Sequence, residues 1–358
     1  MRKRFIGLVL LAAFLTACAP ATPAPTPTPA GPRTLTIMTH DSFNISEETM
    51  AAFEAAHDVK VEVLKSGDAG LMLNQAILSA ENPLADVIYG VDNTLMSRAL
   101  EAGIVEPYAS PVLAEIPAHL ELDPEHRLLP VDYGDVCLNY DKAWFEERGL
   151  QPPENLEDLV RPEYKGLTVV ENPASSSPGL AFMLATIGHF GLTGDYTWLD
   201  YWAELRENDV LVTTGWEEAY WGAFTYGSQG EGDRPIVVSY ASSPPVEVYF
   251  AEEEFEEAPT GVVVGEGSCF RQIEFVGILK GTQNRDLAEA WIDFMLGTTF
   301  QEDIPLHMFM FPANENAALP DVFARFAIIP ESPAFVDPAD IEANRETWIE
   351  QWTETVLR

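Results

Sequence analysis

The chain has 358 residues, 47% of them hydrophobic, and its 57 acidic residues against 20 basic ones give a formal charge of −37. This excess of negative charge argues against nucleic acid as a partner, because the phosphate backbone would repel the protein. The charge is more typical of high solubility or an unusual external milieu than of attraction to a cationic solute, since net charge governs steering rather than the chemistry of a site.

The first 17 residues have the features of a signal peptide. Basic residues stand at positions 2–4, and the apolar stretch from Phe5 to Phe14 is too short to span a bilayer. The string LTAC at 15–18 resembles the bacterial lipobox, in which small residues at the cleavage site expose a cysteine that is then lipidated. We therefore predict a signal peptide over residues 1–17 and a lipid on Cys18. Three basic residues and no acidic residue leave with the signal peptide, so the formal charge falls from −37 to −40.

Residues 18–33 are predicted to be a proline-rich tether. After Cys18 the sequence reads APATPAPTPTPAGPR, and each proline removes a backbone donor and favours an extended conformation in the residue before it. The tether is expected to be a stiff, extended spacer. It would hold an extracytoplasmic protein beside the cell membrane, with the lipid on Cys18 as its only membrane contact.

The segment after the tether alternates strands and helices. Hydrophobic patterning predicts strands over 34–38, 59–64 and 86–89, and helices over 46–57, 69–80 and 94–102. Ser46 is a suitable cap for the first helix, and Gly103 follows the third at a usual C′ position. This alternation predicts a parallel sheet that presents a ligand at the carboxyl ends of its strands.

A second α/β set follows. Strands are predicted over 136–140, 167–170, 236–240 and 270–279, and helices over 180–190, 198–207, 217–224, 286–296 and 342–356. The last helix carries Trp348 and Trp352 at i, i+4, which favours one buried helix face rather than ligand contact.

The body is too long for one hydrophobic core, so two lobes are expected. We predict an α/β fold in which each lobe is a mainly parallel sheet flanked by helices. Lobe 1 would comprise residues 34–134 plus 277–358, and lobe 2 residues 135–276. Cys137 and Cys269 both lie in strand-like runs, where a disulfide and two buried free thiols are both compatible with the sequence.

Sequence motifs of catalysis are missing. The chain has no G-x-S-x-G, no H-E-x-x-H, no P-loop and no Rossmann glycine fingerprint. Its six histidines lack the short spacing of a zinc site. We therefore expect no catalytic residue, no metal site and no cofactor, and favour a protein that binds a small molecule.

The string NPASSSPGL at 172–180 is the first candidate for ligand chemistry. Ser177 suits the N-cap of the following helix and Pro178 its first turn, while Ser176 adds a second hydroxyl. A helix N-terminus with adjacent hydroxyls suits phosphate or carboxylate, and an ordinary helix cap explains the same residues equally well.

Two aspartates follow predicted strands and precede predicted helices. Asp68 in KSGDAG and Asp92 in GVDN would each pair with a cation if they face a cleft between the lobes. Both residues are equally suitable as helix N-caps.

Aromatic residues gather at strand ends and loop edges. Singly each is more typical of a core residue, but together with carboxylates they indicate a pocket for a flat cationic heterocycle, held by stacking and cation–π contacts. These aromatic candidates are Tyr133, Trp216, Tyr220, Tyr240, Phe309 and Phe311.

Seven short strings occur in one order along the chain, and in that order they resemble the thiamine-binding periplasmic proteins of ABC importers. The strings are THDSF at 39–43, ADVIYGVDN at 85–93, DYG at 132–134 with YDK at 140–142, SSPGL at 176–180, GWEEAY at 215–220, SYASSP at 239–244 and WIEQW at 348–352. The likeness runs from about residue 34 to residue 358.

The resemblance implies a type II periplasmic-binding-protein fold whose two lobes close over thiamine, its monophosphate or its diphosphate. Such a protein is a monomer that delivers its ligand to the permease subunit of an ABC transporter, with no reaction. On this basis Asp68 is a candidate partner of the thiazolium. Ser176, Ser177 and Trp216 are candidates for the hydroxyl or phosphate end, and Tyr240 and Phe309 are candidate ring contacts.

Two positions depart from the family pattern. His40 stands where the family has Tyr, and Phe309 stands where Trp is expected. Both keep a flat ring but change hydrogen bonding and stacking area. Polyamine and ferric iron are alternative ligands, although the Tyr-Tyr pair typical of iron sites is missing. A secreted hydrolase or transferase using the same cleft, and a purely structural lipoprotein, are alternatives of other classes.

Overall fold

The computed structural model describes residues 33–251 and 255–358. The predicted signal peptide, Cys18 and the tether up to residue 32 lie outside the described residues and stay predictions. Arg33, which we assigned to the tether, is instead the first residue of strand β1 and forms an ion pair with Asp286. In the described part of the chain, every helix is too short or too polar to cross a membrane.

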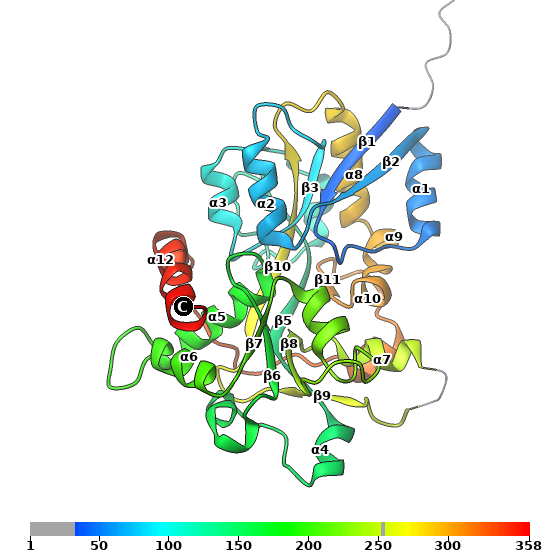
Figure 1. Cartoon of the computed structure of the whole chain (residues 1–358). Helices are drawn as coiled ribbons and strands as arrows, with labels where there is room; N and C mark the ends of the chain where they lie inside the picture. Colours follow the sequence, from blue (N-terminus) through cyan, green and yellow to red (C-terminus); the bar gives the residue numbers. More distant parts are fainter. Residues whose placement is uncertain (1–32, 252–254) are drawn as a thin grey trace, which may run out of the picture.

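The upper half, as drawn in Figure 1, is built on three parallel strands. Strand β1 (Arg33–Thr39) pairs with β2 (Val59–Lys65) on one side and with β3 (Val87–Asp92) on the other. Helices α1 (Glu47–His57) and α2 (Ala69–Leu78) connect these strands, and α3 (Met96–Glu101) follows β3. Ser46 accepts a hydrogen bond from the Thr49 N–H, so the predicted cap of α1 is confirmed.

The lower half repeats this arrangement. Strand β6 (Thr168–Glu171) pairs in parallel with β7 (Leu211–Thr213) and β8 (Ile236–Tyr240). Helix α5 (Ser177–Phe190) packs against β6 and β8 and is buried from its first residue to Ile187, and α6 (Trp198–Glu207) packs against α5. The predicted helix at 217–224 is a π-helix over Glu218–Ala223.

Two long strands join the halves. Strand β5 (Leu129–Asp141) descends from the upper half and pairs with β8, and β10 (Phe270–Leu279) returns and pairs with β3. The sheet is therefore continuous, in the order β2-β1-β3-β10-β5-β8-β6-β7. The predicted α/β class is confirmed, but the expectation of mainly parallel sheets is wrong at the centre. Strands that connect the halves in opposite directions must pair antiparallel with each other.

Smaller elements complete the two halves. They are β4 (Val105–Glu106), α4 (Lys142–Arg148), α7 (Pro244–Phe250), β9 (Thr260–Val263), α8 (Arg285–Leu296), α9 (Thr298–Gln301), α10 (Ile304–His307), β11 (Phe311–Pro312), α11 (Asp321–Phe326) and α12 (Pro338–Val356). Short 3-10 helices occupy 111–115, 156–160 and 162–164.

Helix α12 contacts both halves. Trp352 is fully buried and meets the ring of Trp202 on α6 edge-on at 5.4 Å, and Trp348 is also buried. The prediction that these two tryptophans pack in the core is confirmed. Towards the start of the helix, Arg345 donates to the Thr94 carbonyl beside α3. The exact division of the chain into lobes stays a prediction.

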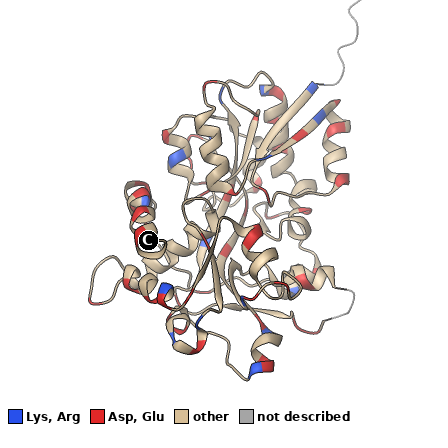
Figure 2. Ribbon diagram, in the orientation of Figure 1, with Lys and Arg blue, Asp and Glu red and all other residues tan. Residues whose placement is uncertain are grey.

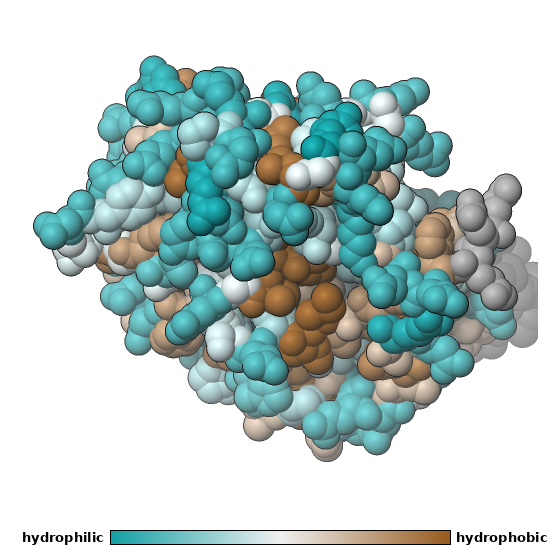
Figure 3. Space-filling view, turned by 90° about the horizontal axis from the view of Figure 1, so that it is seen from below, coloured by the Kyte–Doolittle hydropathy of each residue, from teal (hydrophilic) through white to brown (hydrophobic). Residues whose placement is uncertain are grey.

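Acidic residues occur on helices of both halves (Figure 2), in keeping with the composition. The face seen from below is largely hydrophilic, with a hydrophobic area near its middle (Figure 3). The acidic residues are thus not confined to one half of the molecule.

Candidate ligand-binding site

A pocket of about 610 Å³, part of it open to solvent, lies between the two halves. It adjoins the carboxyl ends of β1, β2 and β8, where the α/β pattern predicts a ligand. Its lining residues are His40, Ser42, Asp68, Ser177, Pro178, Trp216, Trp221, Tyr240, Ser243, Val246, Glu274, Met308, Phe309 and Met310. Six of the predicted ligand-binding residues are therefore brought together: His40, Asp68, Ser177, Trp216, Tyr240 and Phe309.

Asp68 lines the pocket and also caps a helix. One carboxylate oxygen, Oδ1, accepts from the Ala69 N–H at 2.6 Å and from the Ser177 N–H at 3.4 Å. The other, Oδ2, accepts from the Trp216 N–H at 3.0 Å. Burial raises the pKa of Asp68, while the N–H groups of Trp216 and Ala69 act to lower it. The carboxylate thus joins α2 of the upper half to two segments of the lower half.

Asp92 lies outside the pocket lining. Its side chain is buried, and Oδ1 accepts from the Thr94 N–H, the Thr94 hydroxyl and the Leu95 N–H. Burial raises its pKa to about 7. Of the two roles considered for this aspartate, the structure shows the one in the backbone turn before α3.

A buried polar group forms one wall of the pocket. The Nε2 atom of His40 lies 3.4 Å from Oε1 of Glu274 on β10. The Tyr89 hydroxyl donates to Asp132 and lies 3.2 Å from Oε2 of Glu274. The carboxyl groups of Asp132 and Glu274 are buried close together, so one of them holds a proton more readily than the other.

Burial and neighbouring charges shift the pKa values of His40, Glu274 and Asp132 in this group. Burial acts to lower the pKa of His40, but the charge and hydrogen bond of Glu274, together with the charge of Asp68, leave the pKa of His40 raised. Burial acts to raise the pKa of Glu274, but the charge of His40 and hydrogen bonds to His40, Asp132 and Tyr89 together leave that pKa lowered. Burial and the charge of Glu274 hold the pKa of Asp132 well above its usual range. These pKa shifts favour the charged forms of His40 and Glu274 and the neutral form of Asp132.

Sequence reasoning missed Glu274, Asp132 and Tyr89. A signal was present, because Glu274 interrupts the apolar run IEFVGI and Asp132 stands in the DYG string. Neither signal identifies a partner, since the register of β10 against its neighbours is needed for that.

Aromatic rings form the opposite wall. Trp216 stacks on Tyr220 with ring centroids 4.8 Å apart, and its indole N–H donates to the Ser239 hydroxyl at 2.9 Å. Trp221, which the sequence reasoning did not select, meets Trp216 edge-on and also lines the pocket. Tyr220 is buried behind Trp216, outside the lining, and its hydroxyl donates to Glu247. Tyr220 thus supports the wall without facing the pocket.

Two further predicted positions lie elsewhere than expected. Tyr133 is outside the lining, stacked on Phe311 at 5.4 Å, with the Arg271 guanidinium 5.0 Å from its ring centroid. Ser176, not Ser177, is the N-cap of α5: its hydroxyl accepts from the Gly179 N–H at 3.4 Å. The predicted cap was wrong by one residue because adjacent serines are equally suitable and proline is tolerated throughout the first turn.

Because Ser176 caps the helix, the Ser177 side chain is not used as the cap and faces the pocket instead. Its hydroxyl accepts from the Gln272 side-chain amide at 3.2 Å and lines the cavity. Ser42 and Ser243 add two more hydroxyls to the lining. The pocket therefore combines aromatic faces, two carboxylates, one imidazole and three serine hydroxyls.

Comparison with known proteins identifies the family of the chain. The sequence profile of the bacterial extracellular solute-binding proteins matches residues 82–328. The chain belongs to this family. A thiamine-binding periplasmic protein of Escherichia coli (strain K12) is 30% identical over 90% of this chain and 94% of the relative, and one from Salmonella typhimurium is 29% identical over the full length of both. The resemblance noted from the sequence is thus confirmed.

Solved structures agree with the sequence comparison. A periplasmic thiamin binding protein superposes with a TM-score of 0.80 at 25% identity, covering 91% of this chain and 97% of that one. A ferric binding protein from Campylobacter jejuni superposes with a TM-score of 0.70 at 19% identity, covering 90% and 99%, and shows the fold alone. The predicted periplasmic-binding-protein fold is confirmed.

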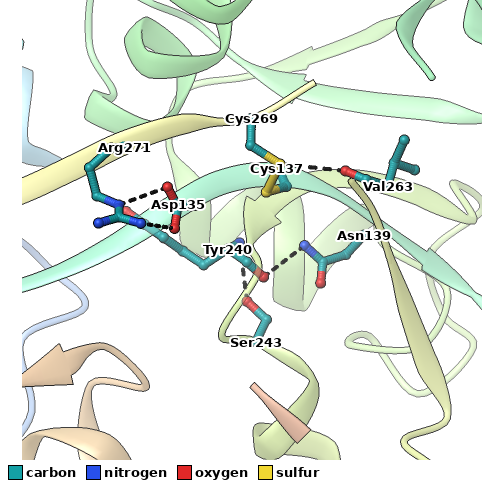
Figure 4. The surroundings of a disulfide bond; sticks show 8 residues. All are labelled: Asp135, Cys137, Asn139, Tyr240, Ser243, Val263, Cys269 and Arg271. Atoms are coloured by element: carbon teal, nitrogen blue, oxygen red, sulfur yellow. Dashed lines mark hydrogen bonds and ion pairs between the residues drawn. A yellow bond between two sulfur atoms is a disulfide. The ribbon is translucent and has the colours of Figure 1, made fainter. Parts of the chain in front are cut away.

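In this solute-binding protein a disulfide lies near Tyr240 and Ser243, two residues of the pocket lining (Figure 4). Cys137 on β5 and Cys269, just before β10, are bonded to each other, which answers the question that the sequence left open. Beside them Tyr240 is fixed by Ser243, whose hydroxyl accepts from the Tyr240 N–H at 3.2 Å, and by Asn139, whose amide donates to the Tyr240 carbonyl at 3.0 Å. The disulfide thus steadies the strand pair that carries one edge of the pocket.

Within residues 33–251 and 255–358, no group of three or more His, Cys, Asp and Glu side chains has a geometry that could hold a metal ion. The lining of the pocket includes no Lys or Arg.

Proposed function

We propose that this solute-binding protein captures thiamine or one of its phosphate esters in the pocket between its halves. The observation that carries the proposal is the pairing of aromatic rings with carboxylates in a single cavity. Thiamine is a flat aminopyrimidine joined to a cationic thiazolium, so it needs stacking surfaces and negative charge. The names of the relatives from Escherichia coli and Salmonella typhimurium, which are thiamine-binding proteins, support the same ligand.

The polar residues of the lining suit distinct parts of this ligand. Asp68 would attract the thiazolium, and Trp216 with Tyr240 would stack on its rings. His40 would contact the ligand where the family has Tyr. The serine hydroxyls would hydrogen-bond the hydroxyethyl end.

We further propose that the protein acts outside the cytoplasm and passes its ligand to the permease subunit of an ABC transporter. The signal-peptide pattern, the lipobox-like string ending at Cys18 and the proline-rich tether support this location. So does the periplasmic placement in the names of the relatives. The ligand would leave chemically unchanged, because a carrier needs only to bind and release it.

Calorimetric titration with thiamine, its phosphates, spermidine and Fe(III) tests the proposal. Heat with a thiamine species is expected, and absence of heat with every one of them would refute it. Spermidine is the second candidate, because Asp68, Glu274 and the rings would also suit a polyamine. Native mass spectrometry of the freshly purified protein adds an independent check, since a ligand recovered unchanged argues against a hydrolase or transferase.

The variant Trp216→Ala tests the location of the site. Its affinity for thiamine is expected to fall by about 1–3 kcal/mol, the range for a desolvated stacking or cation–π contact. Trp144→Ala is the matched control. It also removes a tryptophan ring, on which the Arg148 guanidinium stacks, but Trp144 on α4 lies outside the pocket lining. If the two variants bound thiamine with equal affinity, Trp216 would not be part of the binding site.

A further inference from the structure

Glu247 is a buried carboxyl that lies outside the pocket lining. It is 7% exposed and stands on α7, four residues after Ser243. One oxygen, Oε1, accepts from the Tyr220 hydroxyl, and the other, Oε2, accepts from the Thr260 hydroxyl at 3.2 Å. Glu247 therefore joins three elements of the lower half, namely the π-helix, α7 and β9.

Tyr220 belongs to a small hydrophobic cluster that is separate from the main core, and the partly buried Trp216 packs against this cluster. The buried members of the cluster are Val169, Ala219, Tyr220, Phe224 and Val237. The ring of Tyr220 contacts Trp216 at a centroid distance of 4.8 Å and Phe224 at 5.5 Å. The chain also closes over Tyr220, since a Cβ atom added at Gly227 would lie 2.2 Å from its carbonyl oxygen and 3.0 Å from its Cδ1 atom. The position of the Trp216 ring therefore follows that of Tyr220.

A second set of hydrogen bonds leads from Trp216 back to α7. The indole N–H donates to the Ser239 hydroxyl at 2.9 Å, and that hydroxyl lies 2.9 Å from the hydroxyl of Ser243, the residue before α7. Both serines are buried. The contacts form a closed ring that runs from Trp216 to Ser239, Ser243, Glu247 and Tyr220 and returns to Trp216. This ring fixes the indole both at its edge and at its face.

The Glu247 carboxyl keeps the Tyr220 ring in place within this ring of contacts. Tyr220 is fully buried, and a buried hydroxyl that loses its acceptor costs free energy. Without the carboxyl, Tyr220 would shift towards water or another acceptor, and the Trp216 ring stacked on it would shift as well. Burial raises the pKa of Glu247 to about 7, and both forms of the carboxyl have an oxygen that can accept from Tyr220. The hydrogen bond therefore persists when Glu247 gains or loses its proton.

We propose that Glu247 is a positioning residue for the ligand: through Tyr220 it holds the indole of Trp216 in the orientation that stacks on a flat ring. The inference rests on the proposed function and deepens it. Glu247 acts without touching the ligand. It keeps the aromatic wall ordered before the ligand arrives, so that less conformational freedom is lost on binding.

Calorimetric titration of single and double variants with thiamine tests the proposal. Tyr220→Phe and Glu247→Leu should each weaken binding about threefold to tenfold, the effect of one hydrogen bond. Glu247→Gln should bind within about twofold of the wild type, because its amide oxygen can accept from the Tyr220 hydroxyl. In a Trp216→Ala background, Glu247→Leu and Tyr220→Phe should cause no further loss, since their effect on the ligand passes through the Trp216 ring.

Tyr108→Phe is the matched control. The Tyr108 hydroxyl lies 3.0 Å from both carboxylate oxygens of Asp293, so this variant also loses a bond between a tyrosine and a carboxylate, but outside the pocket lining. Its affinity for thiamine should equal that of the wild type. Thermal unfolding checks that each variant is folded. If Glu247→Leu does not fold, Tyr220→Phe with and without Trp216 provides the same test.

The outcomes separate the inference from the proposed function. Wild-type affinity in Tyr220→Phe and Glu247→Leu would overturn the inference while the proposed function stands. So would a loss of affinity that is equally large with and without Trp216, because it would show a general effect on the fold. No binding of any thiamine species to the wild-type protein would overturn the proposed function and the inference with it.

Discussion

The loops before α2 and α3 carry the same sequence signal, an aspartate between a parallel strand and a helix, but the two aspartates bind different parts of the chain. Asp92 bonds to residues two and three positions ahead of it. Asp68 bonds to its neighbour Ala69 and to residues 109 and 148 positions away. The first carboxylate stabilises its own turn, whereas the second joins the two halves of the molecule.

The position of each strand in the sheet explains the difference. Strand β3 has β1 on one side and β10 on the other, and Asp92 lies directly opposite Glu274 in that register. Strand β2 is at the edge of the sheet, so the loop after it is free to approach the lower half. The rule that ligands bind at the carboxyl ends of strands therefore needs a second condition: the strand end must face the other half of the molecule.

The largest effect is expected when the disulfide between Cys137 and Cys269 is removed. The double variant Cys137→Ser/Cys269→Ser should be less stable by about 2–5 kcal/mol, because the bridge spans a separation of 132 residues and restricts the unfolded chain. Denaturant unfolding under oxidising conditions measures the loss. Reduced wild-type protein should behave like the variant, and equal stability of all three forms would contradict the prediction.

The second-largest effect is expected in the pH dependence of stability, which the buried carboxyl groups determine. Burial raises the pKa values of Asp92 and Glu247 to about 7, so the folded state holds protons that the unfolded state has released. Stability should fall as pH rises from about 4 to about 7, on the order of 3 kcal/mol per group. The raised pKa of His40 acts in the same direction, since its stabilisation is complete below about 6.5 and lost above its folded value.

Thermal unfolding at pH 5 and pH 8 measures this dependence. The midpoint should be higher at pH 5, and the difference should shrink in Asp92→Asn and in Glu247→Gln. The lowered pKa of Glu274 does not reverse the trend, because its stabilisation is lost only when pH falls below about 4.5. A higher midpoint at pH 8 would show that these carboxyls are ionised in the folded protein.

Local patterns predicted much of the fold. The elements expected at 198–207, 236–240 and 270–279 match α6, β8 and β10 residue for residue. Each of these segments carries its own hydrophobic period and end signals, so short-range information is sufficient. The mixed order of the sheet was not predictable in this way, because it depends on which strands connect the halves.

The site was predicted only in part for the same reason. Trp216 and Tyr240 lie in strings that the family shares, and Asp68 follows a predicted strand, so these features are visible in sequence. The His40–Glu274 pair joins residues on β10 and at the end of β1, and only the assembled sheet brings them together. Whether Ser176 or Ser177 is the cap depends on the residue at which α5 begins, and the sequence does not specify this to within one residue.

Removal of the Asp92 carboxylate tests whether this aspartate only stabilises its own turn. At pH 5, Asp92→Ala should lose about 2 kcal/mol of stability, because the Thr94 and Leu95 N–H groups lose a buried acceptor. Its affinity for thiamine should equal that of the wild type, since Asp92 lies outside the pocket lining. Denaturant unfolding and calorimetry measure the two quantities. A loss of affinity as large as that of an Asp68 variant would mean that the two loops act together.

The smallest change in stability is expected at the other loop. Asp68→Ala removes the side-chain cap of α2 and should cost about 1 kcal/mol, the usual loss for a capping side chain. The affinity for thiamine should nevertheless fall more than in Asp92→Ala, since the lost charge faces the ligand. The two aspartates would then have opposite profiles, one affecting stability and the other binding. If Asp68→Ala lost more stability than Asp92→Ala and kept its affinity, the bonds from Asp68 to Trp216 and Ser177 would serve the fold rather than the site.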